Sequence, residues 1–222
     1  MLVERKKILE ARIRKNDVPT VYAKIAPKHD MWGKVAESKA RNRCLELANI
    51  QNHQAVLEVA VGTGLAFEEI LKANPDGRNE GVDRSEEMLI RAKKRAEASG
   101  MKNYRLNLGD AYNLEYEDNA FDILINNYMF DLLPEGDFTT VLTEFKRVLR
   151  PGGRLVLVNM AKGERWYNFI WEIIYRISPA LFGGCRGIYL LPYVESMGFK
   201  EVKREFISQM TLPSEVIYGI KP

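Results

Sequence analysis

Residues 56–71, with the sequence VLEVAVGTGLAFEEIL, constrain the fold of this chain more than any other stretch. An apolar run of β type carries the acid Glu58 near its end, and a turn containing Gly62 and Gly64 follows at once. A helical pattern begins directly after the turn. A strand, a glycine turn and a helix N-terminus in this order form the nucleotide-binding corner of open α/β folds. For this stretch taken alone, the alternative is an ordinary strand-to-helix turn.

The acid Glu58 bears on which nucleotide this corner would bind. A dinucleotide lays its pyrophosphate against the glycine turn, where a carboxylate would repel it. S-adenosylmethionine (SAM) has no phosphate there and brings an ammonium and a sulfonium. The chain also has Phe67 where the dinucleotide pattern G-x-G-x-x-G requires a third glycine. The stretch therefore favours SAM over NAD, and an NAD-type oxidoreductase is the rival enzyme class.

Composition limits the class of protein. The chain has 222 residues, a hydrophobic fraction of 46% and a formal net charge of +3. These values suit one α/β domain and argue against a dedicated nucleic-acid-binding protein. Cys44 and Cys185 provide neither a disulfide framework nor the spacing of a metal cluster. Residues 1–15 are too charged for a signal peptide, and no apolar run reaches about 20 residues, so we expect a cytoplasmic protein.

Strand-like and helical patterns alternate from residue 55 onward. Strands are predicted at residues 55–59, 78–82, 104–108, 121–126 and 154–159. Helices are predicted at residues 65–73, 86–98 and 138–149. This alternation indicates a parallel sheet with helices on both faces. Two final strands, at 200–207 and 215–220, lack a crossover helix between them and should pair antiparallel at one edge.

We therefore expect an α/β fold with a doubly wound, mostly parallel, seven-stranded sheet and an antiparallel edge strand. All 222 residues would form a single domain. Its three parts would be an N-terminal helical cap (residues 1–50, with helices at 1–16 and 34–50), a cofactor-binding core (51–160), and substrate-covering helices with the final strands (161–222, with a helix at 188–197).

Polar residues end four successive strands, and the carboxyl ends of parallel strands meet in one crevice. They are Glu58, Asp83, Asp110 and Asn126. Asp83 is spaced from Glu58 like a ribose-binding acid, although it also suits the N-cap of the next helix. Met88 would lie against the adenine ring or in the core. An acid at Asp110 would accept the exocyclic amine of adenine, with the backbone N–H of Ala111 facing the ring.

These motifs resemble the class I SAM-dependent methyltransferases over residues 40–160. The stretch 58–64 resembles the first motif of that family, with Ala60 where glycine is usual. Residues 81–83, 109–111, 121–122 and 149–153 match its later landmarks. The resemblance implies SAM as cofactor, S-adenosylhomocysteine as product, and the cofactor-binding residues Tyr22, Glu58, Ala60, Gly62, Gly64, Asp83, Arg84, Met88, Asp110, Ala111 and Asn126.

A narrower resemblance lies in residues 22–30, YAKIAPKHD, which are similar to the ubiquinone/menaquinone-biosynthesis methyltransferases. That family usually has tyrosine where this chain has His29. The resemblance implies in-line displacement of the methyl group by an acceptor atom. His29 is the candidate general base if the acceptor must lose a proton, and a surface histidine is the alternative. Tyr22 would lie near the methionine end of SAM or pack a helix.

Several acceptors are disfavoured. Residues 126–129 (NNYM) lack the prolines of amino-group methyltransferases, two cysteines are few for arsenite methylation, and a basic RNA-binding domain is missing. A small, apolar acceptor of quinone-precursor or lipid type remains, without a nucleic-acid partner. The aromatic segment 164–182 would cover this acceptor, contact a membrane surface peripherally, or form a core or homodimer helix. A SAM-binding regulatory module without turnover is the non-enzyme alternative.

Overall fold

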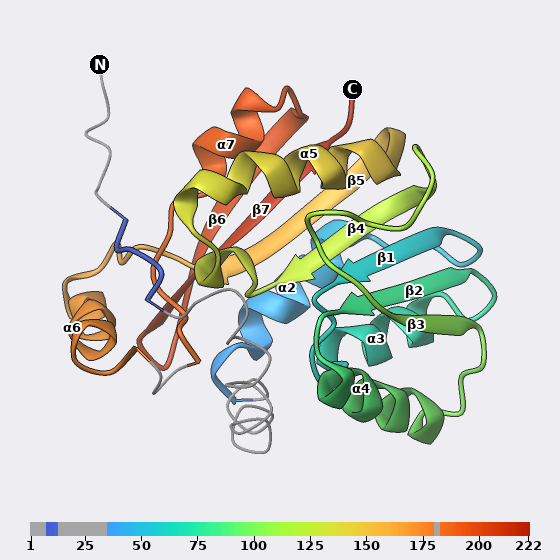
Figure 1. Cartoon of the computed structure of the whole chain (residues 1–222), viewed down its shortest axis with the longest axis horizontal. Coiled ribbons are helices and arrows are strands. Elements are labelled where there is room, and N and C mark those ends of the chain that lie inside the picture. Colours follow the sequence, from blue (N-terminus) through green and yellow to red (C-terminus); the bar gives the residue numbers. More distant parts are fainter. Residues whose placement is uncertain (1–7, 13–34, 180–182) are drawn as a thin grey trace.

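The structure is a computed structural model, which describes residues 8–12, 35–179 and 183–222 of the chain. A seven-stranded sheet lies at its centre, with strand order β3-β2-β1-β4-β5-β7-β6 (Figure 1). The strands are β1 (Ala55–Val59), β2 (Arg78–Asp83), β3 (Tyr104–Leu108), β4 (Phe121–Asn127), β5 (Leu149–Met160), β6 (Lys200–Gln209) and β7 (Leu212–Ile220).

The first five strands run parallel to one another, and β7 pairs antiparallel with both β5 and β6. The chain therefore forms the doubly wound sheet that alternation predicts, with an antiparallel pair at one edge. β7 is inserted between β5 and β6, so the outermost strand of that edge is β6. The order reverses between β1 and β4, and ligands of open α/β sheets bind at such a reversal.

Helices cover both faces of the sheet. They are α2 (Ser38–Ala48), α3 (Leu65–Ala73), α4 (Glu86–Ala98), α5 (Phe138–Val148), α6 (Phe169–Ile177) and α7 (Leu191–Ser196). Within the described part of the chain, no helix is long and apolar enough to cross a lipid bilayer.

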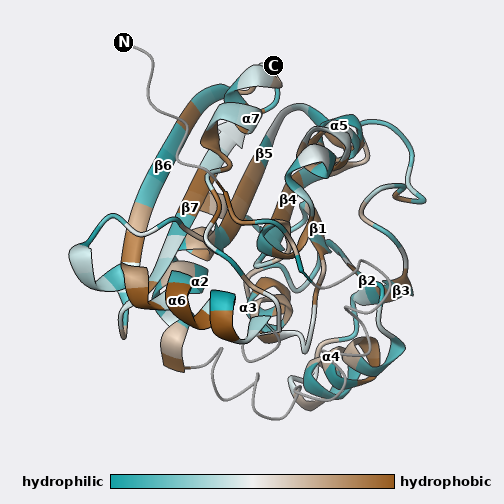
Figure 2. Ribbon diagram, turned by 60° about the vertical axis from the view of Figure 1, so that its left-hand side comes forward, coloured by the Kyte–Doolittle hydropathy of each residue, from teal (hydrophilic) through white to brown (hydrophobic). Residues whose placement is uncertain are grey.

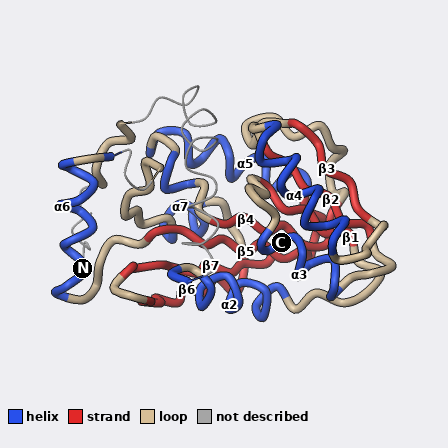
Figure 3. The backbone as a smooth tube through the Cα atoms, turned by 90° about the horizontal axis from the view of Figure 1, so that it is seen from below, coloured by secondary structure: helices blue, strands red, loops and turns tan. Residues whose placement is uncertain are grey.

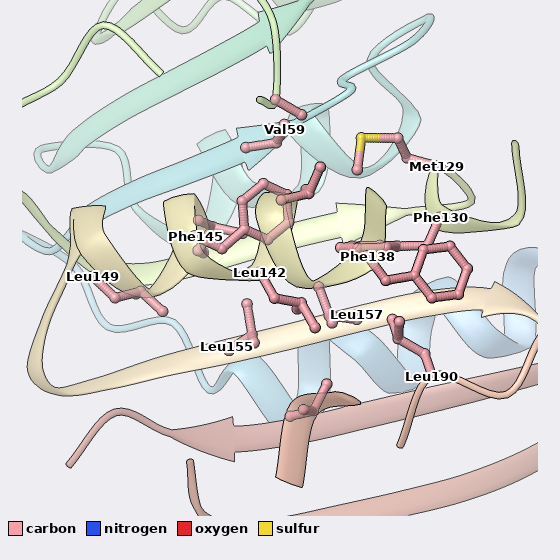
Figure 4. Packing of buried hydrophobic residues seen from close by; sticks show 14 of the residues in the cluster. Val59, Met129, Phe130, Phe138, Leu142, Phe145, Leu149, Leu155, Leu157 and Leu190 are labelled. Carbon is pink, nitrogen blue, oxygen red and sulfur yellow. The ribbon is translucent and has the colours of Figure 1, made fainter. Parts of the chain in front are cut away.

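Residues of the central strands β1, β4 and β5 point alternately into two separate hydrophobic clusters. Leu155 and Leu157 of β5 pack with α5 and α7, whereas Val156 and Val158 pack with α2, α3 and α4. Figure 4 shows Phe138, Leu142 and Phe145 of α5 stacked along β5. A strand buried on both faces explains why the sequence reads as continuous apolar runs rather than as a polar–apolar alternation.

Most of the predicted helix and strand bounds agree with the structure. The helix predicted at residues 1–16 is wrong for the part of it that the structure describes. Residues 8–12 lie inside the predicted helix 1–16, yet they form no helix. The backbone of this segment is used in tertiary contacts instead, since the Tyr175 hydroxyl donates to the Glu10 carbonyl (2.8 Å) and accepts from the Arg12 N–H (3.0 Å). Tyr22 and His29 lie outside the described residues.

Three further elements differ from expectation in length or place. The predicted helix 34–50 is α2, which packs against β4, β5 and β7, so this described part of the expected cap covers the sheet. The helix predicted at 188–197 begins only at Leu191, with Pro192 in its first turn. β5 begins at Leu149 rather than residue 154, because Leu149 already pairs with Phe121 of β4.

Candidate active site

One cavity opens at the carboxyl ends of β1, β2, β3 and β4. It is lined by eight of the residues that the sequence assigns to cofactor binding, namely Glu58, Ala60, Gly62, Asp83, Arg84, Met88, Asp110 and Ala111. The structure thus brings residues up to 53 positions apart in the sequence to one place, as the parallel topology requires.

Of the predicted cofactor-binding residues that the structure describes, two do not line this cavity. Gly64 is the N-cap of α3, and a Cβ on it would come within 2.9 Å of the Ala92 backbone, so its role is the close approach of α3 and α4. Asn126 is fully buried, and its Nδ2 donates to the Val59 carbonyl at 2.7 Å. The neighbouring Asn127 lines the cavity in its place.

The turn after β1 runs through left-handed backbone at three positions. Ala60 has a φ of 58°, Gly62 of 55° and Gly64 of 82°. A left-handed residue that carries a Cβ costs about 1–2 kcal/mol, so Ala60 is strained where glycine would be relaxed. The turn is held by the Val61 N–H, which donates to the Val82 carbonyl at 3.0 Å. The strain lies at the cavity wall, where functional sites commonly store it.

Asp83 clamps the glycine turn to β2. Its Oδ2 accepts the Gly62 N–H at 2.8 Å and its Oδ1 accepts the Ser85 N–H at 2.9 Å. The N-cap of α4 is Ser85, whose hydroxyl accepts the Met88 N–H, so the N-cap alternative for Asp83 is wrong. Burial raises the pKa of Asp83, and the backbone donors oppose that rise. Each carboxylate oxygen keeps a lone pair that can accept a further hydroxyl.

Glu58 is the most deeply buried acid of the cavity, with 2% of its surface exposed. Its Oε1 accepts from Asn127 Nδ2 at 3.2 Å, and its Oε2 has no hydrogen-bond partner among the described residues. Burial raises the pKa of Glu58 to about 8, while the Asn127 hydrogen bond and the charge of Arg41 oppose the rise. A buried carboxylate oxygen without a donor fits a ligand ammonium.

One part of the cavity lining has residues that suit an aromatic ring. Met88 and Ala111 are buried there, and Arg84 Nε lies 3.7 Å from Asp110 Oδ2. Asp110 Oδ1 accepts the Tyr112 N–H at 3.2 Å, which fixes the carboxylate at the cavity mouth. An apolar wall beside a fixed carboxylate suits an aromatic ring with an exocyclic amine.

The segment after β4 and the start of α2 form another part of the lining. Met129, Leu132 and Leu133 make this wall apolar, and Tyr128 lies in it with a φ of 53°. The Tyr128 hydroxyl forms a 2.8 Å hydrogen bond with Ser214 Oγ of β7. This hydrogen bond therefore connects the segment after β4 to the antiparallel edge of the sheet.

Two charged residues line the cavity that the sequence analysis did not identify. Glu37 and Arg41 lie one helical turn apart at the start of α2, and both line the cavity. Burial and the nearby Asp131 raise the pKa of Glu37 to about 8, against the charge of Arg41. An acid and a base at i and i+4 are common on solvent-exposed helices, so no sequence signal separates this pair from an ordinary surface pair.

The sequence model of the family described as "Methyltransferase domain" matches residues 56–153, which include the strand ends that form the cavity. Residues 56–153 thus match a methyltransferase domain, and the chain is a SAM-dependent methyltransferase with SAM as its cofactor. The buried, donor-less oxygen of Glu58 and the paired carboxylates at the ends of β2 and β3 fit that cofactor.

Among its relatives are demethylmenaquinone methyltransferases. The one from Listeria welshimeri is 28% identical over 202 residues, covering 87% of this chain and 82% of the relative. The one from Geobacillus kaustophilus is 29% identical over 197 residues, covering 85% and 81%.

Solved structures share the fold at lower identity. A possible histamine N-methyltransferase from Thermotoga maritima aligns with a TM-score of 0.68 at 20% identity, covering 92% of this chain and 100% of that one. The cyclase SpnF aligns with a TM-score of 0.76 at 17% identity, covering 98% and 99%. Since a protein named as a cyclase has this fold, the fold alone leaves the reaction open.

Proposed function

We propose that this methyltransferase acts on a small, apolar acceptor of the quinone-precursor class. The observation that carries the proposal is the apolar part of the cavity lining that Met129, Leu132 and Leu133 form. The names of the relatives support the same acceptor class. The sulfonium of bound SAM supplies the methyl group and a good leaving group.

The side chains of the cavity match the charges of SAM. Glu58 would accept from the ammonium, and Arg41, which lies close enough to lower the pKa of Glu58, would pair with the carboxylate. Asp83 would accept the ribose hydroxyls while it holds Gly62. Asp110 would accept the adenine amine, with Met88 and Ala111 against the ring faces.

On the acceptor side, we infer that Glu37 takes up the proton that the acceptor loses. Its carboxylate lines the cavity, and a pKa of about 8 makes it a stronger base than an ordinary glutamate near neutral pH. The apolar wall would orient the acceptor and exclude water. His29, the predicted base, stays a prediction, as does Tyr22. We also propose that residues 161–222 cover the acceptor within one domain formed by the whole chain.

The test begins with calorimetric titration of the chain with S-adenosylhomocysteine, with NADH as control. Turnover is then measured with SAM and a set of acceptors that includes naphthoquinols, benzoquinols and phospholipids. Methylation of a quinol is the expected result. Methylation restricted to polar amines, or turnover of none of the apolar acceptors, would contradict the acceptor class while leaving the cofactor intact.

The role of Glu37 has its own test. Glu37→Gln should bind S-adenosylhomocysteine as the parent does but lower kcat by about 100-fold, the usual contribution of a positioned base. The parent rate should rise with pH up to about 8, where Glu37 ionises, and the variant should lose this rise. The control is Glu46→Gln, an exposed acid on the same helix.

A further inference from the structure

A stripe of large apolar side chains is exposed along α6 and the turn before it. Trp166 is 84% exposed and Ile177 is 79% exposed, and Phe169, Ile170 and Ile173 between them are also exposed. These residues follow one another at intervals of one to four positions and share one face of the helix. Figure 2 shows that most of the α6 ribbon has the colour of hydrophobic residues. A patch of this kind marks an interaction site rather than scattered surface residues.

The opposite face of α6 is packed and hydrogen-bonded. Trp171 and Tyr175 are buried, and Trp171 Nε1 donates to the Thr211 carbonyl at 2.8 Å. Asn168 Nδ2 donates to the same carbonyl at 2.7 Å. The helix is thus fixed to the β6–β7 turn by one side, and the apolar stripe faces away from the sheet. Trp171 belongs to the packed side, although the sequence alone groups it with the other aromatic residues.

Basic residues border both ends of the stripe. Arg165 precedes Trp166 and Arg176 precedes Ile177, and both arginines are exposed. Arg12, also exposed, donates from Nη1 to the Arg176 carbonyl at 2.9 Å. The acid Glu164 is held by Arg204 at 2.6 Å. An apolar face with a tryptophan and flanking arginines is complementary to the acyl chains and the anionic headgroups of a bilayer.

The packed side of α6 lies at the end of the sheet where the cavity opens. Trp171 packs in one cluster with Ala36, Met160 and Leu212, and Ala36 directly precedes the cavity residue Glu37. Met160 is the last residue of β5 and Leu212 is the first residue of β7. Both lie at the end of the sheet where the cavity opens. Figures 1 and 3 place α6 at the end of the molecule opposite to α3 and α4.

We propose that the exposed face of α6 docks on the surface of an anionic lipid bilayer, with Trp166, Ile173 and Ile177 inserted below the headgroups. This contact is peripheral and reversible, because a single helix face buries only a few side chains. It stands independently of the acceptor assignment, since it depends on the surface of α6 and not on turnover.

The experiment is flotation of the full chain with vesicles of phosphatidylcholine alone and of phosphatidylcholine with phosphatidylglycerol. We expect flotation with the anionic vesicles that weakens as salt is raised. The double substitution Ile173→Ser and Ile177→Ser should lower the partition coefficient by at least tenfold. Arg165→Gln with Arg176→Gln should reduce the preference for anionic vesicles by about tenfold or more.

A matched control tests whether binding depends on this face of α6 or on any exposed apolar residue. Ile90 on α4 is 54% exposed, much like Phe169 at 56%, but lies at the other end of the molecule. Ile90→Ser should float as the parent does. Titration with S-adenosylhomocysteine reports the fold and the cofactor site of every variant.

Three results would overturn the proposal. One is a parent chain that floats with neither vesicle, and another is flotation that the α6 substitutions leave unchanged. The third is a dimer by sedimentation velocity that dissociates when Ile173 and Ile177 become serine, without vesicle binding, which would make the stripe a subunit interface.

Discussion

Replacement of Glu58 by glutamine should make the ligand-free protein more stable above neutral pH. Glu58 is almost fully buried, and burial raises its pKa to about 8 from an ordinary value near 4.5. Between these two values the folded chain holds a proton on Glu58 that the unfolded chain has released. The free energy of unfolding therefore falls as pH rises, and the contribution of Glu58 is complete only below pH 4.5.

The size of the effect follows from linkage. A group that is protonated only in the folded state lowers stability by about 1.4 kcal/mol for each pH unit, which gives about 3 kcal/mol between pH 5 and 7.5. Glutamine keeps an oxygen for the Asn127 donor and does not titrate. The difference in stability between variant and parent should thus shift by about 2–3 kcal/mol in favour of glutamine over this range.

Urea unfolding at half-unit steps from pH 5 to 8.5 measures this difference. Subtracting parent from variant removes the titrations that the two proteins share. Glu80→Gln is the matched control, because Glu80 is equally buried in β2 but its Oε1 lies 3.0 Å from Arg78 Nε. It should lower stability across the whole range. A difference for Glu58→Gln that stays flat with pH would refute the reasoning from burial.

Three other substitutions follow from the geometry of the backbone and the buried polar groups. Ala60→Gly should raise the free energy of unfolding by about 0.5–1 kcal/mol, measured in urea, because relief of left-handed strain exceeds the entropy that glycine adds to the unfolded chain. Asp83→Ala should weaken S-adenosylhomocysteine binding at least tenfold by calorimetry and also lower the Tm, since the Gly62 and Ser85 N–H groups lose their acceptor. Arg186→Met should cost about 3 kcal/mol in urea, because the buried guanidinium donates to the carbonyls of Leu9, Asp131 and Leu133 at 2.5–2.6 Å.

The cofactor half of the cavity could be predicted because local rules govern it. Each of its acids ends a strand, and the parallel topology alone brings such ends together. The bounds of α3 and α4 follow from Gly64 and Ser85, which are local start signals. The structure lines the cavity with Asn127 and not with Asn126, the residue that the sequence analysis selected. A strand alternates its side chains, so a shift of one residue decides which asparagine meets the cavity.

The remaining features could not be predicted because they depend on contacts between residues far apart in the sequence. Glu37 and Arg41 reach the cavity only because α2 packs across β4, β5 and β7. The two faces of α6 differ because Trp171 finds the Thr211 carbonyl at the β6–β7 turn, 40 residues further along the chain. Aromatic content alone could not divide that segment into a packed and an exposed side.

The two sides of the cavity also differ in composition. The ends of β1, β2 and β3 supply carboxylates, whereas the other side is formed by the segment after β4 and by the start of α2. The Tyr128–Ser214 hydrogen bond and the cluster of Ala36, Trp171 and Leu212 connect that side to α6. Under the two proposals made above, an apolar acceptor would reach the enzyme from the bilayer on which α6 docks.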